Sequence, residues 1–417
     1  MSLSVSRSQR SFRLLWAGQS VSLVGDQIFL FAVPVLVIQE LHATTFQVTA
    51  LATLAKIPFL LFGLPAGVWV ARMGLRKCML TADVVRAACV FSIPVATLFG
   101  IVTFIHVAIV ASVTGVCAVF FQVAYQSYPP LMLDTGDELH RINARLSFSE
   151  ATSLLVGPAI GGWLVNAIGA SRSLIGDAFS YIVSIGTLAS IRQTGKSGAA
   201  SSELALLGDV IVGLLFVWRH PILRPVVLCT AIYNLGSMMY ESIIVLFAIR
   251  HLHLSSWSLA IILAVGGIGF PLGTISGKWL GKRLPLGGSV ILGAVLAILG
   301  LFVSVLAAGK ISMYLLTAGT LVNGAGQGIY IVHTMTIRHV VTPISLATRT
   351  TAVHRFVTWG IFPVGSLCAG LIGTHFGLRA AVIVAASISA CCLLPLFFSS
   401  VRRVDWSACE GMQKIPA

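Results

Sequence analysis

Residues 66–80 read AGVWVARMGLRKCML and follow a long apolar run. Within eleven residues they hold three cations, Arg72, Arg76 and Lys77, and two glycines, Gly67 and Gly74. Charged side chains enter hydrocarbon only at high cost, so the cations keep this segment at a membrane surface. Glycine permits a tight turn and a close approach of helices. The stretch predicts two membrane-spanning helices joined by a short basic turn. Taken alone, it equally fits an ordinary cytoplasmic loop.

The composition of the whole chain predicts a membrane protein. Of its 417 residues, 57% are hydrophobic and 10% charged, with a mean hydropathy of +0.96. Soluble domains carry about 25% charged residues. Apolar runs long enough to cross ~30 Å of hydrocarbon recur along the chain. The net charge of +14 lies in short loops between these runs, as membrane orientation requires, so we expect no nucleic-acid partner.

We predict an all-α membrane protein with twelve transmembrane helices in two pseudo-symmetric six-helix halves. The spans are expected near 13–38, 46–70, 77–99, 102–127, 146–168, 172–192, 223–249, 257–280, 286–308, 311–337, 346–374 and 378–400. The segment GWLVNAIG (162–169) resembles GLIGTHFG (370–377), which indicates an internal repeat. The N-terminal half covers 1–192 and the C-terminal half 223–417. Between them, 193–222 is expected to form a cytoplasmic link with a flexible start and an amphipathic helix over 204–221.

The distribution of Lys and Arg predicts the orientation. With the N-terminus inside, 21 of the 27 cations lie on the cytoplasmic side and four lie outside. This asymmetry places both termini in the cytoplasm. The eight cysteines fall mostly inside apolar runs and show no metal-ligand spacing, so we expect free thiols and no metal site.

A second motif, GPAIGG, lies in the fifth predicted span. Gly157 and Gly161 form a small face for helix packing, Gly162 extends it, and Pro158 removes one backbone donor. The motif fits a generic packing face. It also fits a hinge and seam between the two halves.

These motifs resemble those of the major facilitator superfamily. GVWVARMGLRK is similar to its loop signature between spans two and three, and GPAIGG to its antiporter motif, which is associated with exporters. FRLLWAGQSVSLVGD (12–26), GLLFVWRHPILR (213–224) and GAGQGIY (324–330) resemble the bacterial drug:proton antiporter group that contains macrolide-efflux proteins and the enterobactin exporter. The resemblance implies export across the bacterial cytoplasmic (inner) membrane.

One residue departs from the loop signature. Ala71 stands where the family has an acid that contacts the second half and helps to close the cytoplasmic side. Without that contact we expect the inward-open state to be favoured at rest, because alternating states differ by only a few kcal/mol.

Charges within the spans are candidates for function because each is expensive to bury. Asp26 in span one and Lys56 in span two are expected to meet in the outer half of the membrane, either as a static pair or as a proton-sensitive switch. Glu241 in span seven is a third candidate for proton coupling. Asp83 and Arg86, one helical turn apart, are interpreted as support for the basic turn. Asp177 and Glu150 are expected near span ends, within reach of water.

Polar and aromatic side chains in the helices expected to line the cavity suit amphipathic cargo. They are Gln122, Tyr125, Gln126, Tyr233, Asn234, Tyr240, Gln327 and Tyr330. The sequence shows neither a phosphate-binding GxxxxGK[ST] loop nor HExxH or GxSxG, so we expect no enzyme and no cofactor.

We predict a monomeric secondary exporter that binds a hydrophobic or amphipathic small molecule and is driven by protons. A dedicated exporter of a siderophore or other natural product is an alternative. A lipid or lysophospholipid flippase, or a receptor without transport, is another.

Overall fold

A computed structural model of the chain describes residues 2–63, 65–128, 136–191, 203–281, 283–343 and 346–403. Within these ranges the regular structure is helical and no strand occurs. The chain divides into two compact units. Unit 1 comprises Met1–Ala43 with Leu54–Glu203, and unit 2 comprises Thr44–Thr53 with Leu204–Ala417.

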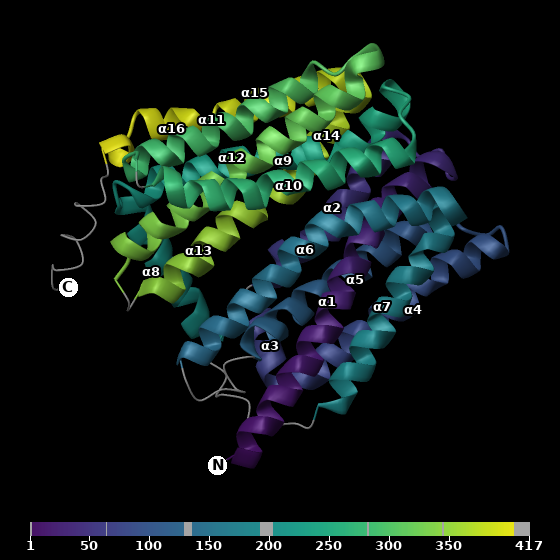
Figure 1. Cartoon of the computed structure of the whole chain (residues 1–417), viewed down its shortest axis with the longest axis horizontal. Coiled ribbons are helices and arrows are strands. Elements are labelled where there is room, and N and C mark those ends of the chain that lie inside the picture. Colours follow the sequence, from purple (N-terminus) through teal and green to yellow (C-terminus); the bar gives the residue numbers. More distant parts are fainter. Residues whose placement is uncertain are drawn as a thin grey trace. The chain divides into compact units, whose positions relative to one another are not determined.

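Unit 1 is built from the N-terminal helices, shown in purple to teal in Figure 1. They are α1 (Ser2–Gln39), the second part of α2 (Thr45–Phe62), α3 (Ala66–Met73), α4 (Leu75–Leu98), α5 (Phe104–Ser127), α6 (Gly136–Ile168) and α7 (Ala170–Ser190). Helix α7 packs against both α1 and α4, and α6 packs against α1. The predicted second span is broken, because Pro65 caps α3 and lacks the backbone donor that would continue α2.

Unit 2 contains the remaining helices. They are α8 (Glu203–Arg219), α9 (Leu223–Leu246), η2 (Phe247–His251), α10 (Ser256–Leu280), α11 (Leu286–Val305), η3 (Gly309–Ile311), α12 (Ser312–Val341), α13 (Ala347–Gly360), α14 (Phe362–Phe376), α15 (Leu378–Ala390), α16 (Leu393–Phe397) and η5 (Ser400–Arg403). The first part of α2 also belongs here, since Thr53 Oγ1 lies 2.6 Å from Ser366 Oγ of α14.

Eleven described helical stretches are long and apolar enough to cross a membrane. The predicted span over 311–337 corresponds to α12, which is not among the eleven although it has 30 residues. Asn323, Gln327 and a run of glycines make this helix less apolar than its neighbours. The all-helical, multi-span fold class is confirmed.

The two units repeat one packing scheme. In unit 1, α7 packs on α1 and α4, and α5 packs on α4. In unit 2, α15 packs on α9 and α11, and α12 packs on α11. The left-handed backbone positions repeat as well: they pair as His42 with His253, Gly100 with Gly309, and Gly169 with Gly377. Each pair occupies the same turn of its unit, so the predicted internal repeat is present in the backbone.

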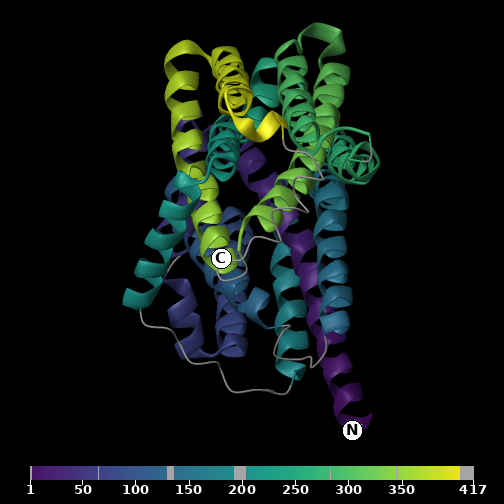
Figure 2. The same ribbon diagram turned by 90° about the vertical axis from the view of Figure 1, so that its left-hand side faces the viewer.

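The helical part of the predicted link forms α8, while 193–202 lie outside the described residues. Helix α8 lies beside the start of α13 (Figure 2), where a Cβ on Gly213 would come 2.9 Å from the Arg349 carbonyl oxygen. After α8, His220 Nδ1 accepts hydrogen bonds from the backbone N–H groups of Ile222 and Leu223. Burial lowers the pKa of His220, which keeps the ring neutral and able to accept these bonds.

Candidate functional site

The interior of unit 1 holds a cluster of charged side chains from three neighbouring helices. Asp26 comes from α1, Asp83 and Arg86 from α4, and Asp177 and Tyr181 from α7. Asp83 and Asp177 are completely buried, and Arg86 is 4% exposed. The packing of α7 against both α1 and α4 brings the five residues together, and Figure 1 shows these helices side by side.

Arg86 is the centre of the cluster. Its Nη1 lies 3.3 Å from Asp26 Oδ1 and its Nη2 lies 3.3 Å from Asp83 Oδ1. Tyr181 donates its hydroxyl to Asp26 Oδ1 at 2.6 Å, and Ser184 donates to Asp83 Oδ2 at 2.6 Å. The guanidinium also lies over the rings of Tyr181 and Phe121, at 4.6 and 4.9 Å from their centroids. These contacts fix the cation between two carboxylates.

Asp177 has weaker contacts than the other two acids. Its Oδ1 accepts a 3.4 Å bond from Ser180, while its buried Oδ2 has no hydrogen-bond partner among the described residues. Two carboxyl groups therefore contact the guanidinium, and a third, that of Asp177, is buried on the neighbouring helix α7. If all three were ionised, the cluster would carry an uncompensated negative charge in a buried place, which is unfavourable. The arrangement favours a proton on at least one carboxyl group.

Asp26 is the most exposed acid of the cluster. Its side chain is 32% exposed, against 5% for Arg86. Arg86 thus links the partly exposed carboxyl group of Asp26 to the buried carboxyl group of Asp83.

Three expectations about these charges were wrong. The salt bridge of Asp26 is with Arg86 and not with Lys56, because α1 packs on α6 and α7 and α4 reaches it across α7. Asp83 and Arg86 do not support the basic turn. Arg86 lies ten residues beyond Arg76, about 15 Å along the helix. Asp177 is buried rather than reached by water.

Unit 2 holds a cavity of about 200 Å³ with a different character. Tyr233, Asn234, Gln327 and Tyr330, four of the predicted cavity residues, line it. Its other lining residues are Cys229, Thr230, Phe270, Ala294, Ala297, Ile331, Thr334, His354, Thr358, Trp359, Phe362 and Cys392. These described lining residues include no Asp, Glu, Lys or Arg.

Hydrogen bonds hold the polar groups of this cavity in place. Thr230 Oγ1 lies 2.7 Å from the Tyr330 hydroxyl. Asn323 donates to the Tyr233 hydroxyl at 2.8 Å, and Gln327 donates to Asn323 at 2.7 Å. With the rings of Phe270, Trp359 and Phe362 beside them, these groups form a neutral amphipathic surface.

The remaining cavity candidates lie elsewhere. Tyr125 belongs to the hydrophobic core of unit 1 and stacks on Phe121. Gln122 is half-buried and Gln126 exposed, both on α5. Tyr240 is 7% exposed within α9, and the exposed Glu241 accepts a 3.1 Å bond from Ser237.

In the basic turn, Gly74 connects two helices and Arg76 bonds to a third. Gly74 has φ 86° and joins α3 to α4. Arg76 donates to the carbonyl oxygens of Leu188 and Ala189 in the last turn of α7. The close approach expected at Gly67 is not made, since a Cβ there would meet no described atom within 4 Å. Ala71 lies in the last turn of α3.

The GPAIGG motif packs inside unit 1. A Cβ on Gly157 would overlap Gln27 of α1, and one on Gly161 would approach Ile28 at 3.3 Å. Helix α6 continues through Pro158. The packing-face interpretation of Gly157 and Gly161 therefore describes what these glycines do within the unit.

Sequence reasoning missed several members of both sites. Asp177 and Tyr181 are spaced four apart, on one face of a helix, which was a usable signal for a shared partner. Asn323, Thr358 and His354 carry no such signal, because single polar residues in apolar helices are common. Among the described residues, no group of three His, Cys, Asp or Glu is placed to hold a metal ion.

The fold and the two sites define a multi-pass membrane transporter. The chain belongs to the transmembrane secretion effector family of the major facilitator superfamily, whose model matches residues 4–417. It is 25% identical to the multidrug efflux pump Tap of Mycolicibacterium fortuitum over 394 residues, covering 91% of this chain and 94% of the pump. Macrolide efflux protein A of Streptococcus pyogenes is 25% identical over 162 residues, 38% of this chain and 40% of that protein.

Solved structures share the fold at lower identity. A bacterial homologue of the iron transporter ferroportin, in an inward-facing state, superposes with a TM-score of 0.76 at 16% identity, covering 93% of this chain and 98% of that one. A mutant of the nucleoside transporter NupG gives a TM-score of 0.75 at 11% identity, covering 93% of this chain and 99% of that one. These likenesses show the major facilitator fold.

Proposed function

We propose that the protein is a proton-coupled exporter of hydrophobic or amphipathic small molecules that works by alternating access. The observation that carries coupling is the pair of carboxylates on Arg86, from Asp26 and Asp83, with the buried Asp177 on the adjoining helix. A transporter that couples to protons needs a group whose charge changes inside the protein, and this cluster supplies one. Export of drug-like molecules is supported by the similarity to efflux pumps along almost the whole chain.

The cavity of unit 2 is the proposed cargo site. Its aromatic rings offer apolar contact, and its hydroxyl and amide groups offer neutral hydrogen bonds. Such a lining accepts varied amphipathic molecules without demanding a charge.

The test uses proteoliposomes that contain a pH-sensitive dye and receive amphipathic dyes or macrolides as cargo. We expect a proton gradient to drive cargo movement in the wild type. Asp26→Asn should abolish gradient-driven movement while cargo binding remains, because the amide cannot release a proton. Glu40→Gln is the matched control, since Glu40 is an exposed acid just beyond the same helix.

Asp26→Asn with full gradient-driven transport would contradict the proposal. Movement of a single siderophore-like compound alone would instead favour a dedicated exporter. Movement of a labelled lysophospholipid alone would favour a flippase. The Asp26→Asn protein must elute as a single species in size-exclusion chromatography. This control separates a loss of coupling from a loss of folding.

We propose that the protein lies in the bacterial inner membrane with both termini on the cytoplasmic side. Cys409 reports on the C-terminus, although it lies outside the described residues. In a variant whose other cysteines are replaced, a membrane-impermeant maleimide should fail to label Cys409 in intact cells and should label it after permeabilisation. Labelling in intact cells would reverse the orientation.

A further inference from the structure

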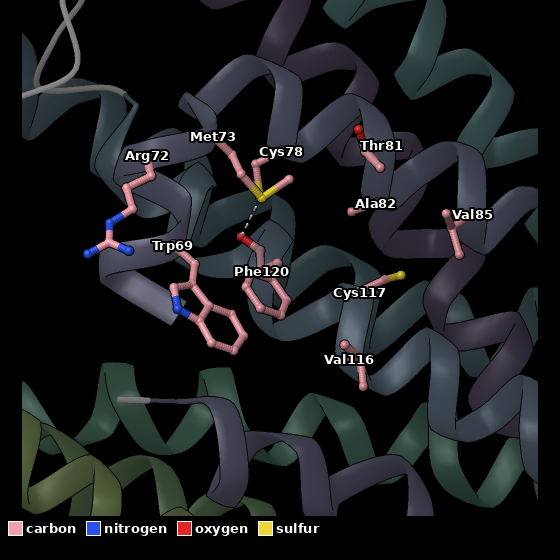
Figure 3. A pocket seen from close by; sticks show the side chains of 10 residues that line it. All are labelled: Trp69, Arg72, Met73, Cys78, Thr81, Ala82, Val85, Val116, Cys117 and Phe120. Carbon is pink, nitrogen blue, oxygen red and sulfur yellow. Dashed lines mark hydrogen bonds between the residues drawn. The ribbon is translucent and has the colours of Figure 1, made fainter. Parts of the chain in front are cut away.

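A second hollow lies in unit 1, apart from the charge cluster and formed by α3, α4 and α5. It is a groove of about 370 Å³ whose lining surface is apolar. Figure 3 shows Trp69 and Met73 of α3, Val85 of α4, and Val116 and Phe120 of α5 around it. The groove begins beside the basic turn and extends along the two spanning helices.

Aromatic stacking fixes one wall of the groove. Trp69 stacks on Phe120 with ring centroids 5.8 Å apart and planes 7° apart, and Phe62 lies 6.2 Å from both rings. Cys78 Sγ lies 3.7 Å from the Phe120 carbonyl oxygen, the dashed line in Figure 3. These contacts hold the α3 side of the groove against α5.

The helices α4 and α5 that form the groove also carry exposed apolar side chains. Val84 and Phe91 on α4 are 52% and 49% exposed, and Ile105 and Ile109 on α5 are 71% and 58% exposed. Ile105, Ile109 and Val116 follow helical spacing on one face of α5. Apolar side chains on the surface of spanning helices suit contact with hydrocarbon, and the lining of the groove has the same apolar character.

A single cation stands among the described lining residues, at the end of the groove beside the turn. Arg72 is exposed, and its guanidinium points away from the apolar lining in Figure 3. Within the described part of the chain it takes part in neither of the two salt bridges. Arg76, by contrast, is bonded to the end of α7. Ala71 supplies no neighbouring acid.

We propose that this groove binds an anionic phospholipid, with one acyl chain in the groove and the phosphate on Arg72. An apolar channel that opens to hydrocarbon and ends at an exposed cation is complementary to such a lipid. Basic residues beside spanning helices attract anionic headgroups, and the phosphate accepts the charge-assisted hydrogen bonds that guanidinium donates. The groove shares no lining residue with the proposed cargo cavity, and none of its lining residues belongs to the charge cluster.

Native mass spectrometry of the purified full-length protein tests the headgroup. Phosphatidylglycerol and phosphatidylcholine with identical acyl chains are titrated separately. We expect the wild type to retain phosphatidylglycerol at least several-fold more, and Arg72→Gln to lose this preference. Arg283→Gln is the matched control, because Arg283 is an exposed cation that lies over the Trp279 ring instead, 3.8 Å from its centroid.

Alkylation tests the position of the chain. Cys117 lines the groove and is a half-buried free thiol. Phosphatidylglycerol should slow its modification by N-ethylmaleimide, as followed by peptide mass spectrometry, and this protection should be lost in Arg72→Gln. Three results would each overturn the site: equal retention of both lipids, equal loss in Arg72→Gln and Arg283→Gln, or lipid retention without protection of Cys117.

Discussion

The two units share a backbone plan and differ in what their matching helices carry. Gly25 of α1 packs against Ser180 and Asp177 of α7, and Gly236 of α9 packs in the same way against α15. Asp177 is the eighth residue of α7, and the eighth residue of α15 is Ala385. Where unit 1 places charges, unit 2 places small side chains.

Unit 2 shows its polarity in another place and another form. Helix α11, the counterpart of α4, has no charged residue. The polar groups that form hydrogen bonds at the cavity of unit 2 are hydroxyls and amides on α9 and α12. An internal repeat therefore constrains turns and helix contacts while leaving side-chain chemistry free to diverge. In the proposed mechanism, unit 1 handles the proton and unit 2 handles the cargo.

Removing the central cation should have the largest effect on this division. Arg86→Gln leaves Asp26 and Asp83 without their buried partner, and breaking such a pair costs about 3–5 kcal/mol. We expect the variant to lose most folded protein in fluorescence-detected size-exclusion chromatography at neutral pH. Adding Asp83→Asn should restore part of it, since one uncompensated charge is removed. Normal yield and thermal stability of Arg86→Gln alone would show that the charges do not depend on Arg86.

The sequence was sufficient to predict the all-helical fold and the turn at Gly74, because hydropathy and glycine act locally, and the similar segments 162–169 and 370–377 indicated the repeat. It did not predict which charges meet. Asp26 pairs with Arg86 rather than Lys56 because α1, α4 and α7 pack together, and helix packing depends on side-chain shape along whole faces. Of the predicted cavity residues, those on α9 and α12 that line the cavity of unit 2 are Tyr233, Asn234, Gln327 and Tyr330. On α5 the same reasoning chose Tyr125, which packs in the core.

A charge placed in unit 2, at the position that matches Asp177 of unit 1, should destabilise the protein. Ala385 is completely buried, and the cluster of unit 1 has no cationic counterpart on α11. Ala385→Asp should destabilise the protein by about 2.5–3.5 kcal/mol at neutral pH, the usual range for a carboxylate inside a membrane. The loss, read as a fall in melting temperature in detergent, should shrink at acidic pH because the neutral acid is easier to bury. Ala385→Asn is the control and should show no such pH dependence.

The matching glycines Gly25 and Gly236 allow the same small substitution to be made in both units. An added methyl at Gly25 would overlap Ser180 and lie 2.6 Å from Asp177 Oδ1, and one at Gly236 would overlap Ser389. Overpacking of this kind costs about 1–3 kcal/mol at either site. We expect both Gly→Ala variants to lose thermal stability, but only Gly25→Ala to impair gradient-driven export beyond that loss. Gly186→Ala, with open space around it, is the control. Equal impairment of gradient-driven export by the two variants would contradict a role of the charge cluster in coupling.

The smallest expected effect concerns the cavity of unit 2. Tyr330→Phe removes a hydroxyl that lies 2.7 Å from Thr230 Oγ1 while keeping the ring. In the proposed cargo site the same hydroxyl also bonds the cargo, and losing one neutral hydrogen bond costs about 1 kcal/mol, a roughly five-fold change in affinity. We therefore expect weaker cargo binding in a fluorescence titration and an unchanged pH dependence of transport, because no charge is altered. Tyr314→Phe is the matched control, since Tyr314 is on the same helix and 75% exposed. Unchanged cargo affinity in Tyr330→Phe, or a shifted pH profile, would mean that cargo and proton are not divided between the units in this way.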